Sequence, residues 1–180
     1  INLENIIKEN TIIFGNLPYN ISSQILIKLL KSCHLTTKYE DLILMFQKEL
    51  GEKILGKFPS KNYGRISILS NYKLFCKDKF LVSSNCFIPK PRVTSMVIHF
   101  KPRKHLSYMI KDITILEKVT NILFSNKRKM INKSLKKIFK NKHIDHIKNL
   151  NLFLRPTDLI PEKYYELANL YERFRKNLLS

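Results

Sequence analysis

The chain has 180 residues, of which 44% are hydrophobic and 26% are charged; this composition supports a buried core and argues against wholesale disorder. Lysine and arginine together number 33 against 14 aspartates and glutamates, so the formal net charge is +19. Such an excess favours a polyanionic partner, nucleic acid before a membrane surface, and no apolar run reaches the roughly 18 residues that a transmembrane helix needs.

The first hundred residues predict strands that alternate with helices. Residues 11–14 are short, apolar and β-branched, which predicts a buried strand that runs into a turn at residues 15–19. The next apolar residues recur at helical spacing after Ser22 or Ser23, either of which can cap a helix. Residues 41–46 form an almost continuous apolar run, which is typical of a strand covered on both faces.

The same alternation continues further along the chain. We expect helices at residues 47–55 and 65–72, and strands at residues 73–82 and 93–100. Residues 87–91 contain two prolines, which fix φ and restrict the residues before them, so this segment is predicted to be extended. Strands that alternate with helices in this way indicate an α/β layer structure.

The character of the chain changes near residue 104, because the residues beyond it carry helical patterns and no convincing strand pattern. We therefore divide the chain into an α/β domain at residues 1–104 and a helical domain at residues 105–180. Within the second domain, we assign packing roles to the residues of the segment 155–170.

A basic helix is predicted at residues 127–142, with Ser125 or Asn126 as its N-cap. This segment holds eight lysines or arginines and no acid. Its cations and its apolar residues fall on different faces: the cations are Lys129, Lys133, Lys136 and Lys140, and the apolar residues are Ile131, Leu135 and Ile138.

The cationic face of this helix is predicted to contact RNA phosphates, which give affinity without base specificity and make binding dependent on salt. The alternative is an ordinary solvated lysine face. The candidate RNA-binding residues are Lys127, Arg128, Lys129, Lys133, Lys136, Lys137 and Lys140.

The cysteines and histidines do not indicate a metal site. The three cysteines form no C-x-x-C pair, which favours a reducing compartment, and hence the cytoplasm, over a disulfide scaffold. His143 and His146 have the spacing of one helix face, but no cysteine or glutamate pattern accompanies them. We therefore expect no metal.

The segment Asn16-Leu17-Pro18-Tyr19 directly follows a predicted strand, at the place where open α/β sheets bind ligands. A planar ring amine is a poor nucleophile, because its lone pair is delocalised into the ring. The Asn16 side-chain oxygen and the Leu17 carbonyl can accept hydrogen bonds from such an amine, and Pro18 keeps these acceptors fixed. Tyr19 offers a face for stacking, worth roughly 1–3 kcal/mol per base. The alternative is an ordinary turn after a strand.

Phe87 is the second candidate for contact with a base. The prolines that follow it stiffen the segment, so its ring would lose little conformational freedom when it closes the other face of an extruded base. The alternative is a stiff loop whose phenylalanine fills a gap in the core.

Five blocks of the sequence, in order, resemble the KsgA/RsmA family of ribosomal RNA adenine dimethyltransferases. They are N-L-P-Y-N-I-S at 16–22, F-Q-K-E at 46–49, Y-G-R-I-S at 63–67, F-I-P-K-P-R-V-T-S at 87–95 and F-S-N-K-R-K-M-I-N-K-S-L at 124–135. The resemblance implies a partial Rossmann-like class I methyltransferase sheet, with the back strands only, followed by a small all-α C-terminal domain.

The resemblance also implies a reaction and the residues that carry it. Members of the family transfer methyl groups from S-adenosylmethionine to N6 of two adjacent adenines near the 3′ end of small-subunit (16S) rRNA, during ribosome biogenesis. Asn16 matches the residue that contacts this cofactor and accepts a hydrogen bond from the adenine amine. Leu17 and Pro18 match the backbone that shapes the pocket, and Tyr19 and Phe87 match its aromatic residues. The adenine must be extruded or already single-stranded, at a cost of a few kcal/mol.

The sequence departs from the family in one respect. Three cofactor-binding features precede the N-L-P-Y motif in the family and do not occur here: a glycine-rich loop, an acid for the ribose and an acid near the adenine ring. We therefore expect the back portion of a methyltransferase, either a fragment or one part of a split protein completed by an N-terminal segment or a second chain. Without the preceding strands, the strand at residues 11–14 would expose an unpaired edge.

Two alternative functions stay open at this point. The chain can be a catalytically inactive remnant that keeps only an RNA-binding face. It can also be a large-subunit rRNA adenine methyltransferase of the macrolide-resistance type, which shares the Asn-Pro-aromatic motif.

Overall fold

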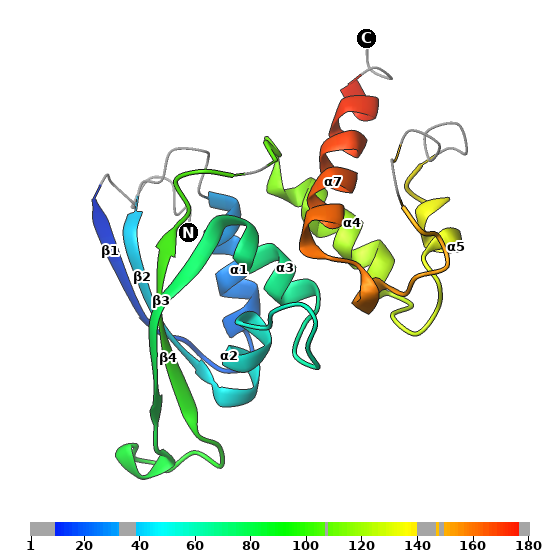
Figure 1. Cartoon of the computed structure of the whole chain (residues 1–180). Helices are drawn as coiled ribbons and strands as arrows, with labels where there is room; N and C mark the ends of the chain where they lie inside the picture. Colours follow the sequence, from blue (N-terminus) through cyan, green and yellow to red (C-terminus); the bar gives the residue numbers. More distant parts are fainter. Residues whose placement is uncertain (1–9, 33–38, 107, 140–146, 148–149, 177–180) are drawn as a thin grey trace.

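The computed structural model describes residues 10–32, 39–106, 108–139, 147 and 150–176, and it combines a four-stranded sheet with helices (Figure 1). The elements are β1 (Thr11–Asn16), α1 (Ser22–Ser32), β2 (Tyr39–Gln47), α2 (Lys48–Ile54), α3 (Arg65–Lys73), β3 (Leu74–Val82), η2 (Ser84–Cys86), β4 (Ser95–Pro102), α4 (Ile113–Phe124), α5 (Asn132–Leu135), η3 (Pro156–Asp158) and α7 (Pro161–Lys176). None of the helices described is long and apolar enough to cross a membrane. The α/β class with a helical C-terminal part agrees with the sequence prediction.

The sheet has the strand order β1-β2-β4-β3, with β1 parallel to β2 and the other two pairs antiparallel. In β2, Leu42, Leu44 and Phe46 are buried, whereas Ile43 and Met45 are only partly buried. This alternation shows that α1, α2 and α3 cover one face of the sheet (Figure 1). The prediction that this strand is covered on both faces is therefore wrong.

β1 forms an edge of the sheet within the described part of the chain, because it pairs with β2 alone. Its side chains are exposed or only partly buried, and Phe14 is 72% exposed. The strand is present where the sequence predicts it, but the prediction that it is buried is wrong. The expected consequence of a missing neighbour, an edge strand with exposed apolar side chains, is confirmed.

The segment around Phe87 differs partly from the prediction. Phe87 itself is extended, with φ −125° and ψ 145°. The backbone nevertheless bends at residues 87–89, and the peptide bond between Ile88 and Pro89 is cis. Proline restricts φ but does not by itself select the isomer of the bond before it, so the sequence pattern did not reveal this bend.

The predicted continuous helix at residues 127–142 is wrong over its described part. Ser125 is the C-cap of α4 rather than the N-cap of a new helix, and turns lead from it to the four-residue helix α5. The backbone N–H of Ile131 donates to the Leu154 carbonyl at 2.9 Å, and Ile131 and Leu135 are buried in the core. This long-range bond and the burial override the local helical pattern.

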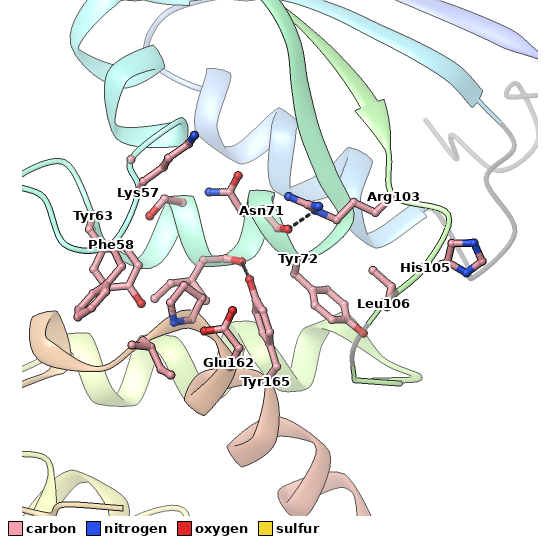
Figure 2. Close-up of a pocket in the computed structure, with 15 residues that line it drawn as sticks. Lys57, Phe58, Tyr63, Asn71, Tyr72, Arg103, His105, Leu106, Glu162 and Tyr165 are labelled. Atoms are coloured by element: carbon pink, nitrogen blue, oxygen red, sulfur yellow. Dashed lines mark hydrogen bonds between the residues drawn. The ribbon is translucent and has the colours of Figure 1, made fainter.

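Two tyrosines hold the helical part against the part that contains the sheet. The hydroxyl of Tyr63, before α3, donates to the Leu159 carbonyl at 2.8 Å. In the opposite direction, the hydroxyl of Tyr165 in α7 donates to the Ile68 carbonyl of α3 at 3.2 Å (Figure 2). Both tyrosines line a cavity of about 450 Å³ between these elements. We call the region where α3 packs against the segment that contains η3 and α7 the seam.

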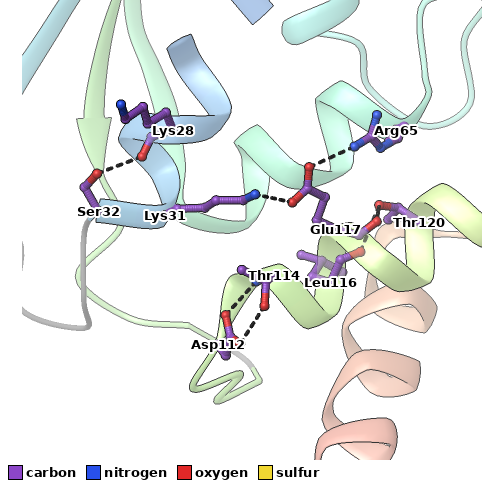
Figure 3. Close-up of polar contacts among 9 residues, drawn as sticks. All are labelled: Lys28, Lys31, Ser32, Arg65, Asp112, Thr114, Leu116, Glu117 and Thr120. Atoms are coloured by element: carbon purple, nitrogen blue, oxygen red, sulfur yellow. Dashed lines mark hydrogen bonds and ion pairs between the residues drawn. The ribbon is translucent and has the colours of Figure 1, made fainter. Parts of the chain in front are cut away.

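An ion-pair cluster adds a second link between the two parts (Figure 3). Glu117 of α4 accepts from Lys31 of α1 at 2.6 Å and from Arg65 of α3 at 3.1 Å. Because all three side chains are partly exposed, each pair contributes modestly to stability. The cluster still favours one orientation of α4 against α1 and α3, since a single carboxylate bridges two helices.

We predict that Tyr63→Phe lowers the free energy of unfolding by about 1–3 kcal/mol, because the Leu159 carbonyl is left without its donor in a buried place. Urea unfolding followed by circular dichroism measures this change. Tyr171→Phe is the matched control, because the Tyr171 hydroxyl accepts from Lys118 in an exposed place. Equal decreases for the two variants would contradict a special role of the seam.

We also predict that the protein becomes less stable in alkaline solution. Burial raises the pKa of Tyr63 and of Tyr165 above the ordinary value of 10.0. The neutral hydroxyl is therefore favoured in the folded state. The contribution of these tyrosines to folding stability is complete below about pH 10, and it decreases as the pH rises above that value, where the unfolded chain ionises first. Urea unfolding at a series of pH values should show a weaker alkaline decrease for Tyr63→Phe. An unchanged decrease would exclude Tyr63 as a source.

Candidate active site and cationic hollow

The turn after β1 is fixed by hydrogen bonds within its own residues. Asn16 is the last residue of β1. The backbone N–H of Ile21 donates to the Pro18 carbonyl at 3.1 Å, and the Ser22 hydroxyl donates to the Tyr19 carbonyl at 3.1 Å. These bonds form as α1 begins, so the start of the helix positions the four residues before it.

The connection between β3 and β4 approaches this turn from the other side. The five residues that the sequence singles out for contact with a base and its cofactor line one shared pocket of about 370 Å³. They are Asn16, Leu17, Pro18, Tyr19 and Phe87, and Ile88, Pro89 and Pro91 complete the lining. We call this the acceptor pocket. Phe87 is half-buried and lies 68 positions from Tyr19 in the sequence, so the fold rather than local structure joins them.

One hydrogen bond ties the two sides of the acceptor pocket together. The Tyr19 hydroxyl lies 2.6 Å from the hydroxyl of Ser95, the first residue of β4. Ser95 is fully buried and pairs with Gln47 at the end of β2. The Tyr19 ring is therefore anchored at its far end, which limits the freedom that it would lose on stacking against a base. Sequence reasoning did not identify Ser95, because a serine that begins a strand carries no distinctive pattern.

The Asn16 side chain is available for a ligand. It is exposed, and it forms no hydrogen bond with another residue of the described chain. Its amide oxygen is a strong acceptor, and two aromatic residues and three prolines line the same pocket. The arrangement can hold a planar, apolar ring that carries an amino group, as adenine does.

A second concave surface lies in the helical part and is strongly cationic. This hollow of about 650 Å³ is lined by Asn126, Arg128, Lys129, Met130, Asn132, Lys133, Ser134, Lys137 and Arg155. None of these lining residues is acidic, and none of their cations forms an ion pair with a residue that the structure describes. We call it the cationic hollow.

The structure separates the candidate RNA-binding residues into three groups. Four of them line the cationic hollow: Arg128, Lys129, Lys133 and Lys137. Lys127 and Lys136 are exposed but do not line it, and Lys140 lies outside the described residues. The helical face that was expected to align Lys129, Lys133 and Lys136 does not form, since the chain turns before α5.

Arg155 was assigned a packing role, and this assignment is wrong. Its side chain is exposed and lines the cationic hollow, whereas the neighbouring Pro156 is buried. The long-range bond between Ile131 and Leu154 brings this residue to the hollow. A usable signal was present in the sequence, since arginine is seldom fully buried without a partner.

A third cavity, of about 420 Å³, lies between the first turn of α1 and the end of α4. Its cationic lining residues are Lys53, Lys61, Arg65 and Lys127. Lys127 adjoins Arg128 of the cationic hollow, and Ser23, which also lines this cavity, closely follows Tyr19 of the acceptor pocket. Cations therefore occur on both parts of the protein and between them.

The fold is that of a methyltransferase. The chain is similar to a crystal structure of a dimethyladenosine transferase from Plasmodium falciparum, with a TM-score of 0.72 and 24% identity over 92% of this chain and 66% of that one. It is also similar to a crystal structure of the 23S rRNA methyltransferase ErmE, with a TM-score of 0.62 and 17% identity over 91% of this chain and 66% of that one.

Sequence comparison identifies the family. The family model described as ribosomal RNA adenine dimethylase matches residues 2–173. Two curated relatives are both named ribosomal RNA small subunit methyltransferase A. The protein of Pelagibacter ubique (strain HTCC1062) is 40% identical over 164 residues, which is 91% of this chain and 62% of that protein. The protein of Buchnera aphidicola subsp. Acyrthosiphon pisum (strain APS) is 37% identical over 169 residues, 93% of this chain and 60% of that protein.

The chain therefore belongs to the ribosomal RNA adenine dimethylase family. It spans about 60% of the length of the curated relatives that it matches. The resemblance that the five sequence blocks indicate is thus confirmed at the level of the family.

Proposed function

We propose that this chain is part of an rRNA adenine dimethyltransferase, which transfers methyl groups to N6 of two adjacent adenines near the 3′ end of small-subunit rRNA. One observation carries the proposal: Asn16, Leu17, Pro18, Tyr19 and Phe87 line a single pocket at the carboxyl end of β1. The family membership and the names of the curated relatives support the same substrate. The role would place the protein in the cytoplasm, in ribosome biogenesis.

The acceptor pocket performs its share of the reaction by holding the adenine amine in place. The Asn16 oxygen and the Leu17 carbonyl accept hydrogen bonds from the N6–H groups of the adenine, which orients the nitrogen for attack. Tyr19 stacks against the adenine ring, and Phe87, in the connection between β3 and β4, contacts the ring as well. Stacking at roughly 1–3 kcal/mol per base offsets the cost of removing the adenine from a helix.

S-adenosylmethionine, when bound, supplies an electrophilic methyl group. Among the described residues, Asn16 fits its site, since this exposed amide lies at the end of an edge strand and beside the acceptor pocket. The sequence has four glycines and no G-x-G cluster, so we assign only Asn16 to the cofactor. We propose that a segment or chain beyond these residues supplies the remaining contacts.

We propose that residues 1–104 belong to the catalytic domain and that residues 105–180 form an RNA-binding domain. The cationic hollow supports the second assignment, because it gathers Arg128, Lys129, Lys133, Lys137 and Arg155 without an acid among its lining residues. Phosphates bind such a surface by releasing counterions, with little dependence on base sequence. Lys127, Lys136 and Lys140 remain candidates for the same role.

The two alternatives have less support. A large-subunit substrate is favoured by the shared Asn-Pro-aromatic motif and by the likeness to ErmE, which at 17% identity concerns the fold alone. The curated relatives are small-subunit methyltransferases at 37–40% identity. An inactive RNA-binding remnant would also keep the cationic hollow, so methyl transfer is the measurement that separates it from an enzyme.

We predict that Asn16→Ala abolishes methyl transfer while leaving RNA affinity nearly unchanged, because Asn16 aligns the amine but contributes little to binding. Labelled S-adenosylmethionine and undermethylated small ribosomal subunits measure the transfer, and filter binding measures affinity. Ser84→Ala is a matched control, since this small polar residue of η2 is close in sequence to Phe87 but does not line the acceptor pocket.

The unsubstituted protein is assayed both alone and joined to the preceding segment of a relative, because we propose that such a segment supplies the remaining cofactor contacts. Incorporation that Asn16→Ala removes supports the enzyme. No incorporation by the chain alone agrees with cofactor contacts that lie outside it. No incorporation by the joined protein, when it is folded and binds small subunits, supports the RNA-binding remnant. Normal turnover by Asn16→Ala would contradict the role of this residue.

We predict that Lys133→Glu combined with Lys137→Glu weakens RNA binding for every sequence. The slope of the logarithm of the binding constant against the logarithm of the salt concentration should decrease in magnitude by about one for each phosphate that the variant no longer binds. Lys28→Glu combined with Lys111→Glu changes the net charge by the same amount outside the hollow and should have a smaller effect. Filter binding at several salt concentrations measures both slopes. Equal effects would mean that overall charge, rather than the hollow, attracts the RNA.

A further inference from the structure

Phe153 is an exposed aromatic residue in a turn of the helical part. Its side chain is 74% exposed, whereas Leu152 and Leu154 on either side pack against the core. The Asn151 side-chain oxygen accepts from the Phe153 N–H at 2.9 Å, and the Asn151 carbonyl accepts from the Leu154 N–H at 3.3 Å. The two flanking leucines and these bonds fix the turn, so the ring is presented to solvent from a constrained backbone.

This turn adjoins the cationic hollow. The Leu154 carbonyl accepts from the backbone N–H of Ile131 at 2.9 Å, which places the turn alongside the segment before α5 (Figure 1). Met130, next to Ile131, lines the hollow and is also exposed. Arg155, two residues after Phe153, lines the hollow as well. An exposed ring therefore lies at the margin of a surface that carries five cations.

We propose that Phe153 is a stacking platform for an unpaired base of the RNA whose phosphates occupy the cationic hollow. The inference rests on the proposed function, and it adds a second base-binding position outside the acceptor pocket. Single-stranded nucleic acid is the ligand that uses both features at once, because cations follow its backbone and an aromatic ring accepts any base. Paired bases in an A-form helix do not expose a face to such a ring.

Charge complementarity selects RNA over a protein partner. An apolar patch on a protein interface is usually surrounded by mixed polar residues, but none of the residues that line this hollow is acidic. The platform would hold a nucleotide that flanks the target adenine. The helical part would then recognise both the unpaired bases and the phosphate charge of the RNA. Base stacking at this position predicts weak sequence preference and strong preference for single strands.

The chain contains no tryptophan, so Phe153→Trp introduces a single fluorescent reporter at the platform. The probe is a single-stranded RNA of about 10 nucleotides, within the usual site size of single-strand binders, compared with a duplex of the same length. We expect quenching by the single strand and little by the duplex. Phe75→Trp is the control, because Phe75 is 38% exposed on β3 and lines neither the acceptor pocket nor the cationic hollow, so its signal should not change.

Affinity provides the second measurement. Phe153→Ala should weaken single-strand binding by about fivefold to about a hundredfold, the equivalent of removing one stacked base, and should leave duplex binding and the melting temperature unchanged. An RNA without bases should bind wild type and Phe153→Ala equally.

Several results would overturn the proposal. These are RNA binding without quenching of Phe153→Trp, equal quenching of Phe75→Trp, or a response to an acidic peptide but not to RNA, which would indicate a protein interface. The methyl-transfer assay separates this inference from the proposed function. Transfer with no response at position 153 contradicts only the platform, and quenching without transfer contradicts only the enzyme.

Discussion

The reciprocal tyrosine hydrogen bonds of the seam are the constraint on which the rest of the arrangement depends. Tyr63 reaches from the sheet part to the Leu159 carbonyl, and Tyr165 reaches back from α7 to the Ile68 carbonyl. Buried hydroxyls tolerate little displacement, since an unpaired one costs more than a formed bond returns. The acceptor pocket belongs to the sheet part and the cationic hollow to the helical part. The seam therefore fixes the distance between the pocket that holds the target adenine and the hollow that binds RNA phosphates.

The distribution of charge distinguishes side chains that are paired within the protein from the cations of the hollow. Several acids of this cationic chain are paired within the protein. Glu117 binds Lys31 and Arg65, and the hydrogen bond from His99 is the chief reason that the pKa of the Asp41 carboxyl is lowered, with a further contribution from Lys101. The cations of the hollow have no such partners among the described residues. The mutual repulsion of these cations lowers the stability of the folded protein, and a bound polyanion would relieve this repulsion.

The sequence predicted the order of strands and helices. In α1, apolar spacing reports directly on burial, since Leu26, Leu29 and Leu30 are buried as their spacing indicates. Local chemistry singled out the segment Asn16–Tyr19 and Phe87 as two separate candidates, and only the family resemblance connected them, since nothing local joins Tyr19 with Phe87. Sequence reasoning failed where distant residues decide the backbone. The bond from Ile131 to Leu154 ends the predicted basic helix, and the same bond brings Arg155 to the hollow. Neither consequence has a signature in a single sequence.

The acceptor pocket owes its shape to the sheet. Ser95 holds the Tyr19 hydroxyl and pairs across the sheet with Gln47, so the turn after β1 and the connection before β4 are joined through the end of β2. Asn16 differs from these residues, because it lies at the exposed end of an edge strand and has no fixed partner among the described residues. The aromatic residues that stack on the base contribute to binding affinity. The Asn16 amide aligns the amine and contributes to the rate of methyl transfer. This division explains why a substitution at Asn16 is expected to act on the reaction, whereas the aromatic residues and the cationic hollow act on binding.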